Sequence, residues 1–187
     1  MYEVEVKVKA SHDRVQARLA AADATHTATV EQTDTYYDAP HREFEATDEA
    51  LRIRTERTLE PETGTETRLT YKGPRIDDAS KTRAEIETGV ASHEQLAGIL
   101  ENLGFTPAAT VEKTRDRYVI NAYTVTLDAV DGLGTFVEVE TELEPDATTE
   151  AIETAREEAF SLLRDLGLDP DEGIRTSYLG LLLDNQQ

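Results

Sequence analysis

The chain contains no cysteine among its 187 residues. Disulfides, zinc–thiolate sites and cysteine nucleophiles are therefore excluded, and any metal must be bound by oxygen atoms or by histidines. No apolar run approaches the length of a membrane span, and no basic segment followed by an apolar one opens the chain. We therefore expect a soluble, cytoplasmic protein that makes no contact with a membrane.

Positive charge is also scarce, and lysine in particular. The chain has 39 acidic and 19 basic residues, which gives a net charge of −20, and only five of the basic residues are lysines. A surface of this kind repels polyanions, so general nucleic-acid binding is excluded. An acid-rich, lysine-poor surface indicates a high-salt cytoplasm, because molar salt shortens the Debye length to about 3 Å and screens the self-repulsion.

The first stretch, Tyr2–Lys9, alternates strictly between apolar and polar residues, as a β-strand requires. The apolar side would carry Val4, Val6 and Val8. The polar side would carry Glu3, Glu5, Lys7 and Lys9. On this stretch alone, a strand with its polar face in water is the simpler interpretation. The alternative is a strand that presents metal ligands and a phosphate-binding lysine to a cavity.

Similar patterns predict further strands over residues 30–37, 51–54, 67–72, 83–87, 111–119, 123–128 and 135–140. Helices are predicted over residues 11–24, 92–103, 149–166 and 177–183. The buried stripe of the first helix would include Ala22. The second helix carries Ile99 and Leu103, and apolar helix faces of this kind would permit a homodimer.

The two halves of the chain repeat. Glu3 and Glu5 of the first half correspond to Glu85 and Glu87 of the second, and Ser11 corresponds to Ser92 at nearly the same offset. Two copies at so long a period do not make a solenoid. We expect instead one α+β domain over residues 1–187, an eight-stranded antiparallel β-barrel with helices packed outside. Two interleaved, pseudo-symmetric halves would enclose its lumen.

Nine of the 19 basic residues fall on the polar faces of the predicted strands. They are Lys7, Arg52, Arg54, Arg68, Lys72, Arg83, Lys113, Arg115 and Arg117. In a protein this acidic, solvated strand faces should be mostly acidic or rich in threonine. The pattern therefore favours a basic lumen suited to a compact, highly charged anion, and a triphosphate is the obvious candidate.

Carboxylates fall on the same faces by alternation: Glu3, Glu5, Glu85, Glu87, Asp128, Glu138 and Glu140. They either pair with the lumen bases as an ion-pair network or hold a cation among them. Oxygen ligands without cysteine or suitably spaced histidine favour Mg²⁺ or Mn²⁺. No histidine lies on a polar face of a predicted strand, so we do not expect a histidine general base.

These residues resemble the CYTH domain family, also called triphosphate tunnel metalloenzymes. The motif Glu-x-Glu-x-Lys occurs here as Glu3-Val4-Glu5-Val6-Lys7. Further matches run in family order over about residues 1–183. They are Asp34-Thr35-Tyr36-Tyr37-Asp38, Leu51-Arg52-Ile53-Arg54, Tyr71-Lys72-Gly73-Pro74, Arg83 before Glu85 and Glu87, Glu112-Lys113-x-Arg115, Leu127-Asp128, and Gly132-Leu133-Gly134-x-Phe136-Val137-Glu138-Val139-Glu140.

The resemblance implies a triphosphate tunnel with roles for individual residues. The residues near divalent metal would be Glu3, Glu5, Asp128, Glu138 and Glu140. The residues holding the triphosphate would be Lys7, Arg52, Arg54, Lys72, Lys113 and Arg115. The catalytic candidates are Lys7 and Arg83, for the leaving group, and Glu5. Secondary candidates for the lumen are Arg68, Glu85, Glu87 and Arg117.

The segment Tyr2-Glu3-Val4-Glu5 and the turn at Gly132–Gly134 look most like the class IV adenylate cyclase branch, which converts ATP to cyclic AMP and pyrophosphate. The thiamine triphosphatase and inorganic triphosphatase branches share nearly all the charged positions, so hydrolysis of a triphosphate is an alternative. A non-catalytic module that binds polyphosphate or nucleotide is the alternative from another class.

Overall fold

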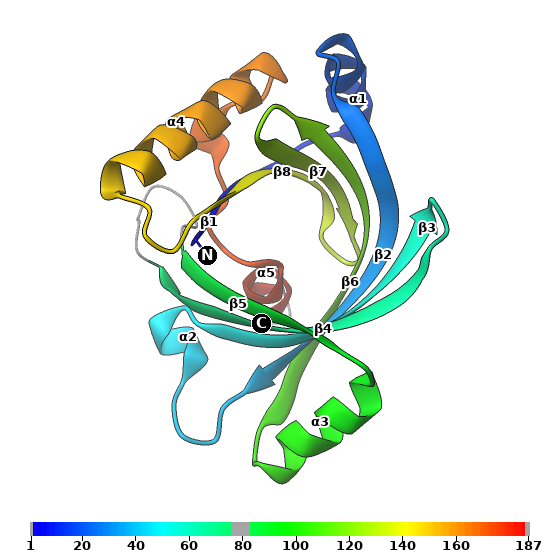
Figure 1. The fold of residues 1–187 in the computed structure, drawn as a ribbon, viewed down its shortest axis with the longest axis vertical. Coiled ribbons are helices and arrows are strands. Elements are labelled where there is room, and N and C mark those ends of the chain that lie inside the picture. The colour runs from blue at the N-terminus through cyan, green and yellow to red at the C-terminus, as the bar shows by residue number, and fades with distance from the viewer. Residues whose placement is uncertain (1, 76–82, 186–187) are drawn as a thin grey trace.

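The barrel predicted from the sequence is confirmed in a computed structural model, which describes residues 2–75 and 83–185. Eight antiparallel strands close into a barrel in the order β1-β5-β4-β3-β2-β6-β7-β8 (Figure 1). The strands are β1 (Tyr2–Lys9), β2 (Thr25–Asp38), β3 (Ala50–Glu60), β4 (Gly64–Arg75), β5 (Arg83–Val90), β6 (Thr106–Ile120), β7 (Tyr123–Val130) and β8 (Gly134–Leu143).

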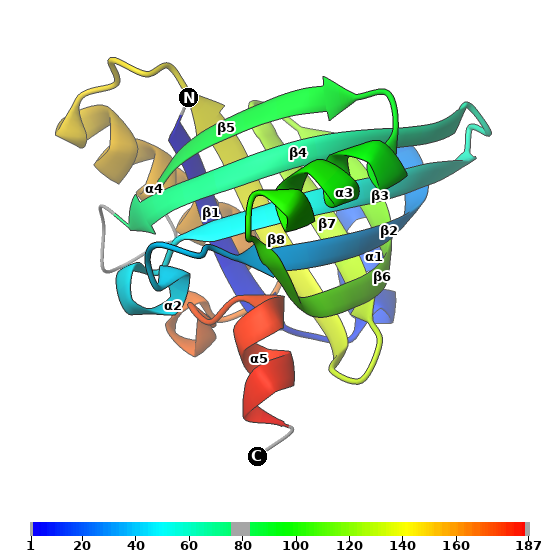
Figure 2. The ribbon, with the colours of Figure 1, turned by 90° about the horizontal axis from the view of Figure 1, so that it is seen from below.

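Helices lie around the outside of the barrel and at one of its ends (Figures 1 and 2). They are α1 (His12–Ala21), α2 (Phe44–Thr47), α3 (His93–Asn102), α4 (Thr149–Asp165) and α5 (Tyr178–Asp184). Within residues 2–75 and 83–185, no helix is long and apolar enough to cross a membrane. The sequence did not predict α2, whose four residues are too few to show a helical period. The prediction for Ala22 was wrong, because this residue ends α1 and is exposed.

The strand register carries the symmetry of the repeat. Tyr2 of β1 pairs with Ala84 of β5, and Gln32 of β2 pairs with Lys113 of β6. In each pair the two partners occupy equivalent positions of the sequence repeat. Strands β1 and β5 also pair with strands of the other half. Strand β1, from the first half, pairs with β8, and β5, from the second half, pairs with β4. The two halves are therefore interleaved around a pseudo-two-fold axis.

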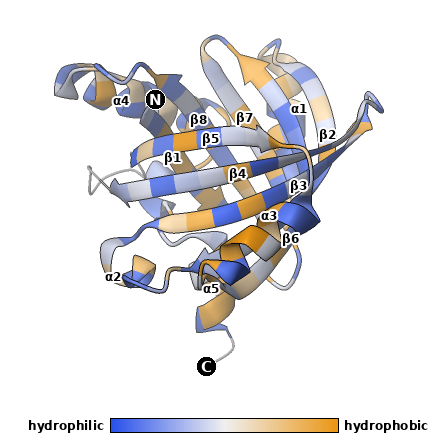
Figure 3. Ribbon diagram, turned by 60° about the horizontal axis from the view of Figure 1, so that its bottom comes forward, coloured by the Kyte–Doolittle hydropathy of each residue, from blue (hydrophilic) through white to orange (hydrophobic). Residues whose placement is uncertain are grey.

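The main apolar core lies between the barrel wall and the helices rather than inside the barrel. Val6 and Val8 of β1 pack with Val15 of α1 and Leu163 of α4. Across the barrel, Leu100 of α3 joins a second cluster on the outer face of β3. Hydrophilic and hydrophobic residues are accordingly interspersed along the strands in Figure 3. The polar side of β1 faces the lumen, which decides between the two interpretations of its alternation.

A small apolar cluster caps one end of the barrel, which we call the closed end. It consists of Tyr36, Val111, Val130, Phe136 and Tyr178. Figure 1 shows α5, which carries Tyr178, across the middle of the ring of strands, and Figure 2 shows it projecting from that end. The segment leading into α5 is anchored to β1, because the amide of Ile174 donates to the Lys7 carbonyl oxygen at 2.7 Å. The lumen is therefore bounded by apolar groups at this end.

Candidate active site

Charged side chains that are almost fully buried line the lumen. The exposed fractions of Lys7, Arg115 and Asp128 are 1%, 5% and 0%, and those of Arg54 and Glu138 are 8% and 3%. Charged residues are rarely buried to this extent unless they are paired. The strand alternation explains their position, since each of them lies on the inward side of its strand.

On the β2–β3 side of the lumen, Asp34 forms a two-point ion pair with Arg54. Both nitrogen–oxygen distances are 2.6 Å, and Arg52 approaches the same carboxylate at 3.3 Å. Burial alone would raise the pKa of Asp34, but the charges of Arg54 and Arg52 hold it well below its ordinary value. Asp34 belonged to a matched motif but was missed as a site residue. Its equivalence to Arg115 in the sequence repeat was the available signal.

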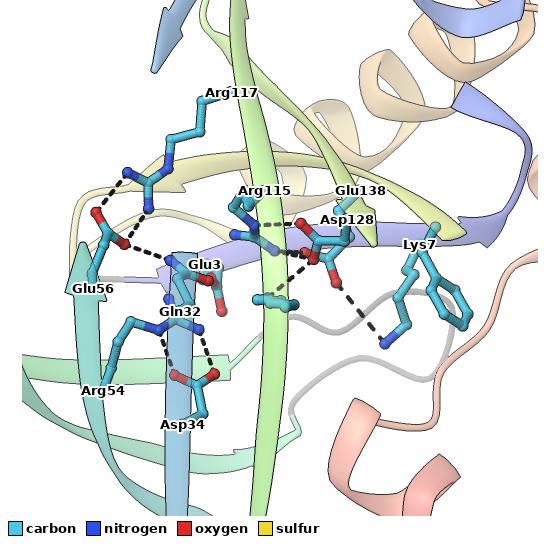
Figure 4. A network of polar contacts seen from close by, with 12 residues as sticks. Glu3, Lys7, Gln32, Asp34, Arg54, Glu56, Arg115, Arg117, Asp128 and Glu138 are labelled. Carbon is cyan, nitrogen blue, oxygen red and sulfur yellow. Dashed lines mark hydrogen bonds and ion pairs between the residues drawn. The ribbon is translucent and has the colours of Figure 1, made fainter. Parts of the chain in front are cut away.

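On the β6–β7 side, Asp128 forms the equivalent pair with Arg115, again with two distances of 2.6 Å. Lys113 donates to the same carboxylate at 3.0 Å, and Arg115 also donates to Glu138 (Figure 4). Burial and the charge of Arg115 lower the pKa of Lys113 to about 8, against the opposing effect of Asp128. Asp128 therefore pairs with the bases rather than standing free among the other carboxylates.

The two ion pairs are related by the pseudo-symmetry with their signs exchanged. Asp34 lies directly opposite Arg54 on β2 and β3, and Arg115 lies directly opposite Asp128 on β6 and β7. Asp34 and Arg115 occupy equivalent positions in the two halves of the sequence repeat. Each half of the barrel thus holds one buried guanidinium in a fixed plane, which is the arrangement needed to bind phosphate oxygens by paired N–H donors.

Carboxylates gather on the wall formed by β5, β1 and β8. Lys72 bridges Glu3 and Glu85 at 2.6 and 2.7 Å. Although burial would raise the pKa of Glu3, Lys72 lowers it to about 2. Glu85 behaves differently, since burial and the charge of Glu3 outweigh Lys72 and raise its pKa to about 7. Burial also raises the pKa of Glu140 to about 7 despite Arg115, with repulsion from Glu3 and other carboxylates adding to it. Negative charge is therefore in excess on this wall.

A divalent cation would suit this excess of carboxylate. Glu5 of β1 lies directly opposite Glu140 of β8, and Glu3 and Glu138 lie on the same two strands. In the part of the chain that the structure describes, no three carboxylates or histidines converge closely enough to form a complete metal site. Mg²⁺ commonly takes only one or two protein carboxylates and completes its shell with water and substrate oxygens. The donor set thus fits Mg²⁺ or Mn²⁺ that arrives with a phosphate ligand.

The remaining sequence candidates Arg68 and Arg117 form ion pairs of their own. Arg68 is partly exposed and pairs with Glu66 and Glu87, at 2.9 and 3.0 Å. Arg117 forms a two-point pair with Glu56 at 2.9 and 2.7 Å, and sequence reasoning missed Glu56. Figure 4 shows this pair beside Asp34 and Arg54.

Arg83 is not part of the lumen network in its hydrogen bonds to the described residues. It donates to the carbonyl and the carboxylate of Asp48, at 2.8 and 2.9 Å, where the chain leaves α2. The structure therefore places this catalytic candidate beside α2 rather than with Lys7 and Glu5.

Histidines stay outside the lumen clusters. His26 lies within β2, because this strand begins earlier than predicted. Its ring contacts Tyr118, and its Nε2 lies 3.6 Å from Asp116. His12 contacts the Phe136 carbonyl oxygen, and the other two histidines contact Thr55 and Phe105. None of these contacts involves a charged residue of the lumen.

A closed antiparallel barrel with buried bases and buried carboxylates facing one lumen defines a charged-tunnel protein. The sequence profile of the CYTH domain matches residues 1–178, and the chain belongs to this family. A protein of Methanocaldococcus jannaschii, provisionally named an adenylate cyclase, is 35% identical over 182 residues, covering 97% of this chain and 98% of that protein.

Solved structures share the fold over nearly the whole chain. A protein of Pyrococcus horikoshii is 39% identical, with a TM-score of 0.88, and the match covers 98% of this chain and 99% of that one. A protein of Hippeastrum is 17% identical with a TM-score of 0.66, covering 98% and 95% of the two chains. The Hippeastrum protein is a candidate adenylyl cyclase described as having a dominant triphosphatase activity.

Proposed function

We propose that this protein is a metal-dependent enzyme that acts on a triphosphate bound in the lumen, and that it is a class IV adenylate cyclase. The observation that best supports this proposal is the separation of basic and acidic side chains within the lumen. A chain of net charge −20 places paired, buried arginines on one side of a closed lumen and surplus carboxylates on the other. The name of the M. jannaschii relative supports the cyclase reaction.

The bases would bind the phosphate chain. Asp34 and Asp128 fix the guanidinium planes of Arg54 and Arg115. Phosphate oxygens can then accept from donors that are already oriented, so little reorganisation is needed during the reaction. Lys113, whose pKa is lowered to about 8, is still mostly protonated at pH 7, and a bound anion would raise its pKa and favour the charged form further.

In the cyclase reaction, the 3′-oxygen of ATP forms a bond to the α-phosphorus, and the bond to the pyrophosphate oxygen breaks as the hydroxyl proton is released. A divalent cation held by Glu3, Glu5, Glu138 and Glu140 would supply a Lewis acid that favours the ionised hydroxyl. Lys7 lies 3.9 Å from Glu138 and would place positive charge near the departing oxygens. Arg83 can contribute only after it leaves Asp48.

Hydrolysis of a triphosphate is the second candidate. The triphosphatase activity ascribed to the Hippeastrum protein favours it, because that protein has the same fold. Water would then attack the terminal phosphorus of thiamine triphosphate or tripolyphosphate in the same cradle of bases. The two reactions differ in which phosphorus faces the nucleophile.

Product analysis separates these reactions. The protein is incubated in about 2 M KCl with ATP, thiamine triphosphate or tripolyphosphate, each with Mg²⁺ or Mn²⁺, and the products are identified by mass. Cyclic AMP with pyrophosphate supports the cyclase, and orthophosphate supports a triphosphatase. Binding without any product would leave only the non-catalytic module.

Glu5→Ala tests the carboxylate wall in the same assay. We expect this change to abolish either activity while the fold is retained. The matched control is Glu31→Ala on the outer, exposed face of β2, which should keep full activity. A fully active Glu5→Ala variant would remove Glu5 from the proposed metal site.

A further inference from the structure

Tyr178 of α5 contacts two lumen bases at the closed end. The ammonium nitrogen of Lys7 lies 4.1 Å from the centre of its ring, and that of Lys113 lies 4.8 Å from it. Lys7 also donates to the Thr176 carbonyl oxygen at 2.9 Å. Phe136 packs edge-on against the same ring at 5.1 Å. One aromatic residue thus contacts bases from β1 and β6, which belong to different halves of the repeat, and cation–π attraction holds their charges at the end of the lumen.

The hydroxyl group of Tyr178 is buried. The residue is 6% exposed, and its oxygen has no hydrogen-bond partner within residues 2–75 and 83–185. Buried hydroxyls are normally hydrogen-bonded, and an unpaired one needs an explanation. Tyr123 provides the contrast in this protein. Its hydroxyl lies 3.0 Å from the Ala155 carbonyl oxygen and 2.7 Å from the Glu158 carboxylate, outside the barrel, and so has an acceptor for its proton.

Two further polar atoms that face the lumen are also buried and have no hydrogen-bond partner among the described residues. They are the amide oxygen of Gln32 and the hydroxyl oxygen of Thr126. Both residues lie on inward positions of their strands, and their exposed fractions are 1% and 0%. The lumen therefore has hydrogen-bonding capacity that its own side chains do not use, which is expected of a site for a polar ligand.

We propose that Tyr178 is a substrate-contacting residue, whose ring positions Lys7 and Lys113 and whose hydroxyl donates a hydrogen bond to a phosphoryl oxygen at the closed end of the lumen. This inference rests on the proposed function. A phosphoryl group suits the position because two ammonium groups lie over the ring and favour an anion between them. Its oxygens are also strong acceptors for a neutral hydroxyl donor.

Two matched tyrosine variants test the contact. Tripolyphosphate with Mg²⁺ is titrated calorimetrically into the wild type, Tyr178→Phe and Tyr123→Phe, and the melting temperature of each is measured. We expect Tyr178→Phe to weaken binding about ten- to a hundredfold, as for loss of a hydrogen bond to a charged group, without lowering the melting temperature. Tyr123→Phe should lower the melting temperature and bind like the wild type. Tyr178→Leu, which also removes the ring, should bind more weakly than Tyr178→Phe.

The outcomes separate this inference from the proposed function. Equal binding by the wild type and Tyr178→Phe would overturn the hydroxyl contact while the triphosphate site stands. Weak binding confined to Tyr178→Leu would reduce Tyr178 to a packing role and would also overturn the inference. A wild type that fails to bind tripolyphosphate would overturn the proposed function itself, and the inference with it.

Discussion

At the scale of single residues, the lumen is organised by buried charges that are paired before any substrate is considered. The pairs Asp34–Arg54 and Asp128–Arg115 have the same distances and opposite orientation of charge. A buried pair of this kind contributes little net stability, but removal of one partner leaves a buried charge uncompensated. These pairs therefore connect the stability of the fold to the binding of an anion.

Asp34→Asn tests this connection. The change keeps the side-chain shape but leaves Arg52 and Arg54 without their carboxylate, so we expect the free energy of unfolding to fall by about 3–5 kcal/mol in urea titrations. Added tripolyphosphate should raise the melting temperature of the variant more than that of the wild type, because phosphate replaces the lost charge. Glu31→Gln on the outer face of β2 is the control and should change stability by less than about 0.5 kcal/mol. Equal stability of Asp34→Asn and the wild type would contradict the role of the pair.

Glu56 predicts a pH dependence of stability. Burial alone would raise its pKa, but hydrogen bonds from Arg117 and Gln32 lower it from the ordinary 4.5 to about 2. Because the unfolded chain binds this proton more tightly, the stabilisation is complete above about pH 4.5 and is lost as the pH falls toward 2. Denaturant unfolding of the wild type and Glu56→Gln over this range should show a shallower acid slope in the variant. Parallel slopes would show that Glu56 does not contribute.

At the scale of elements, the helices differ in how much they contribute to the fold. Leu163 of α4 is fully buried against the barrel, whereas Ile99 of α3 and Leu103, which directly follows α3, are 57% and 64% exposed. We expect Leu163→Ala to cost about 2–5 kcal/mol and Ile99→Ala less than about 0.5 kcal/mol, as measured by denaturant unfolding. A large loss in Ile99→Ala that depends on protein concentration would instead indicate that α3 is covered in a homodimer, which stays a prediction.

Elements whose side-chain pattern is local could be predicted from the sequence. The alternation of Glu3 to Lys7 and the repeat of the two halves were sufficient for the barrel and its charged interior. Contacts that depend on loops and docking could not be predicted. The loop after α2 gives Arg83 its partner Asp48, and the docking of α5 brings Tyr178 onto Lys7. Asp34 was missed for another reason, since a lone carboxylate on a threonine-rich strand does not indicate Arg54 as its partner, and its equivalence to Arg115 in the repeat was the available signal.

At the scale of the whole molecule, the net charge lies on the outer surface. Among the described residues, the buried charged side chains are six bases and six acids, so these charges cancel and nearly the whole net charge of −20 belongs to the outer surface. Repulsion among surface carboxylates opposes folding and is screened by salt. We expect the melting temperature to rise steeply between about 0.1 M and 2 M KCl. An unchanged melting temperature over this range would contradict the proposed adaptation to high salt.

A crystal structure with a non-hydrolysable triphosphate and Mg²⁺ tests whether the lumen is a triphosphate site. We expect the phosphate chain inside the barrel, with contacts to Arg54 and Arg115 and one end near Tyr178. A triphosphate bound on the outer surface, or a lumen whose ion pairs are unchanged at saturating ligand, would contradict this expectation.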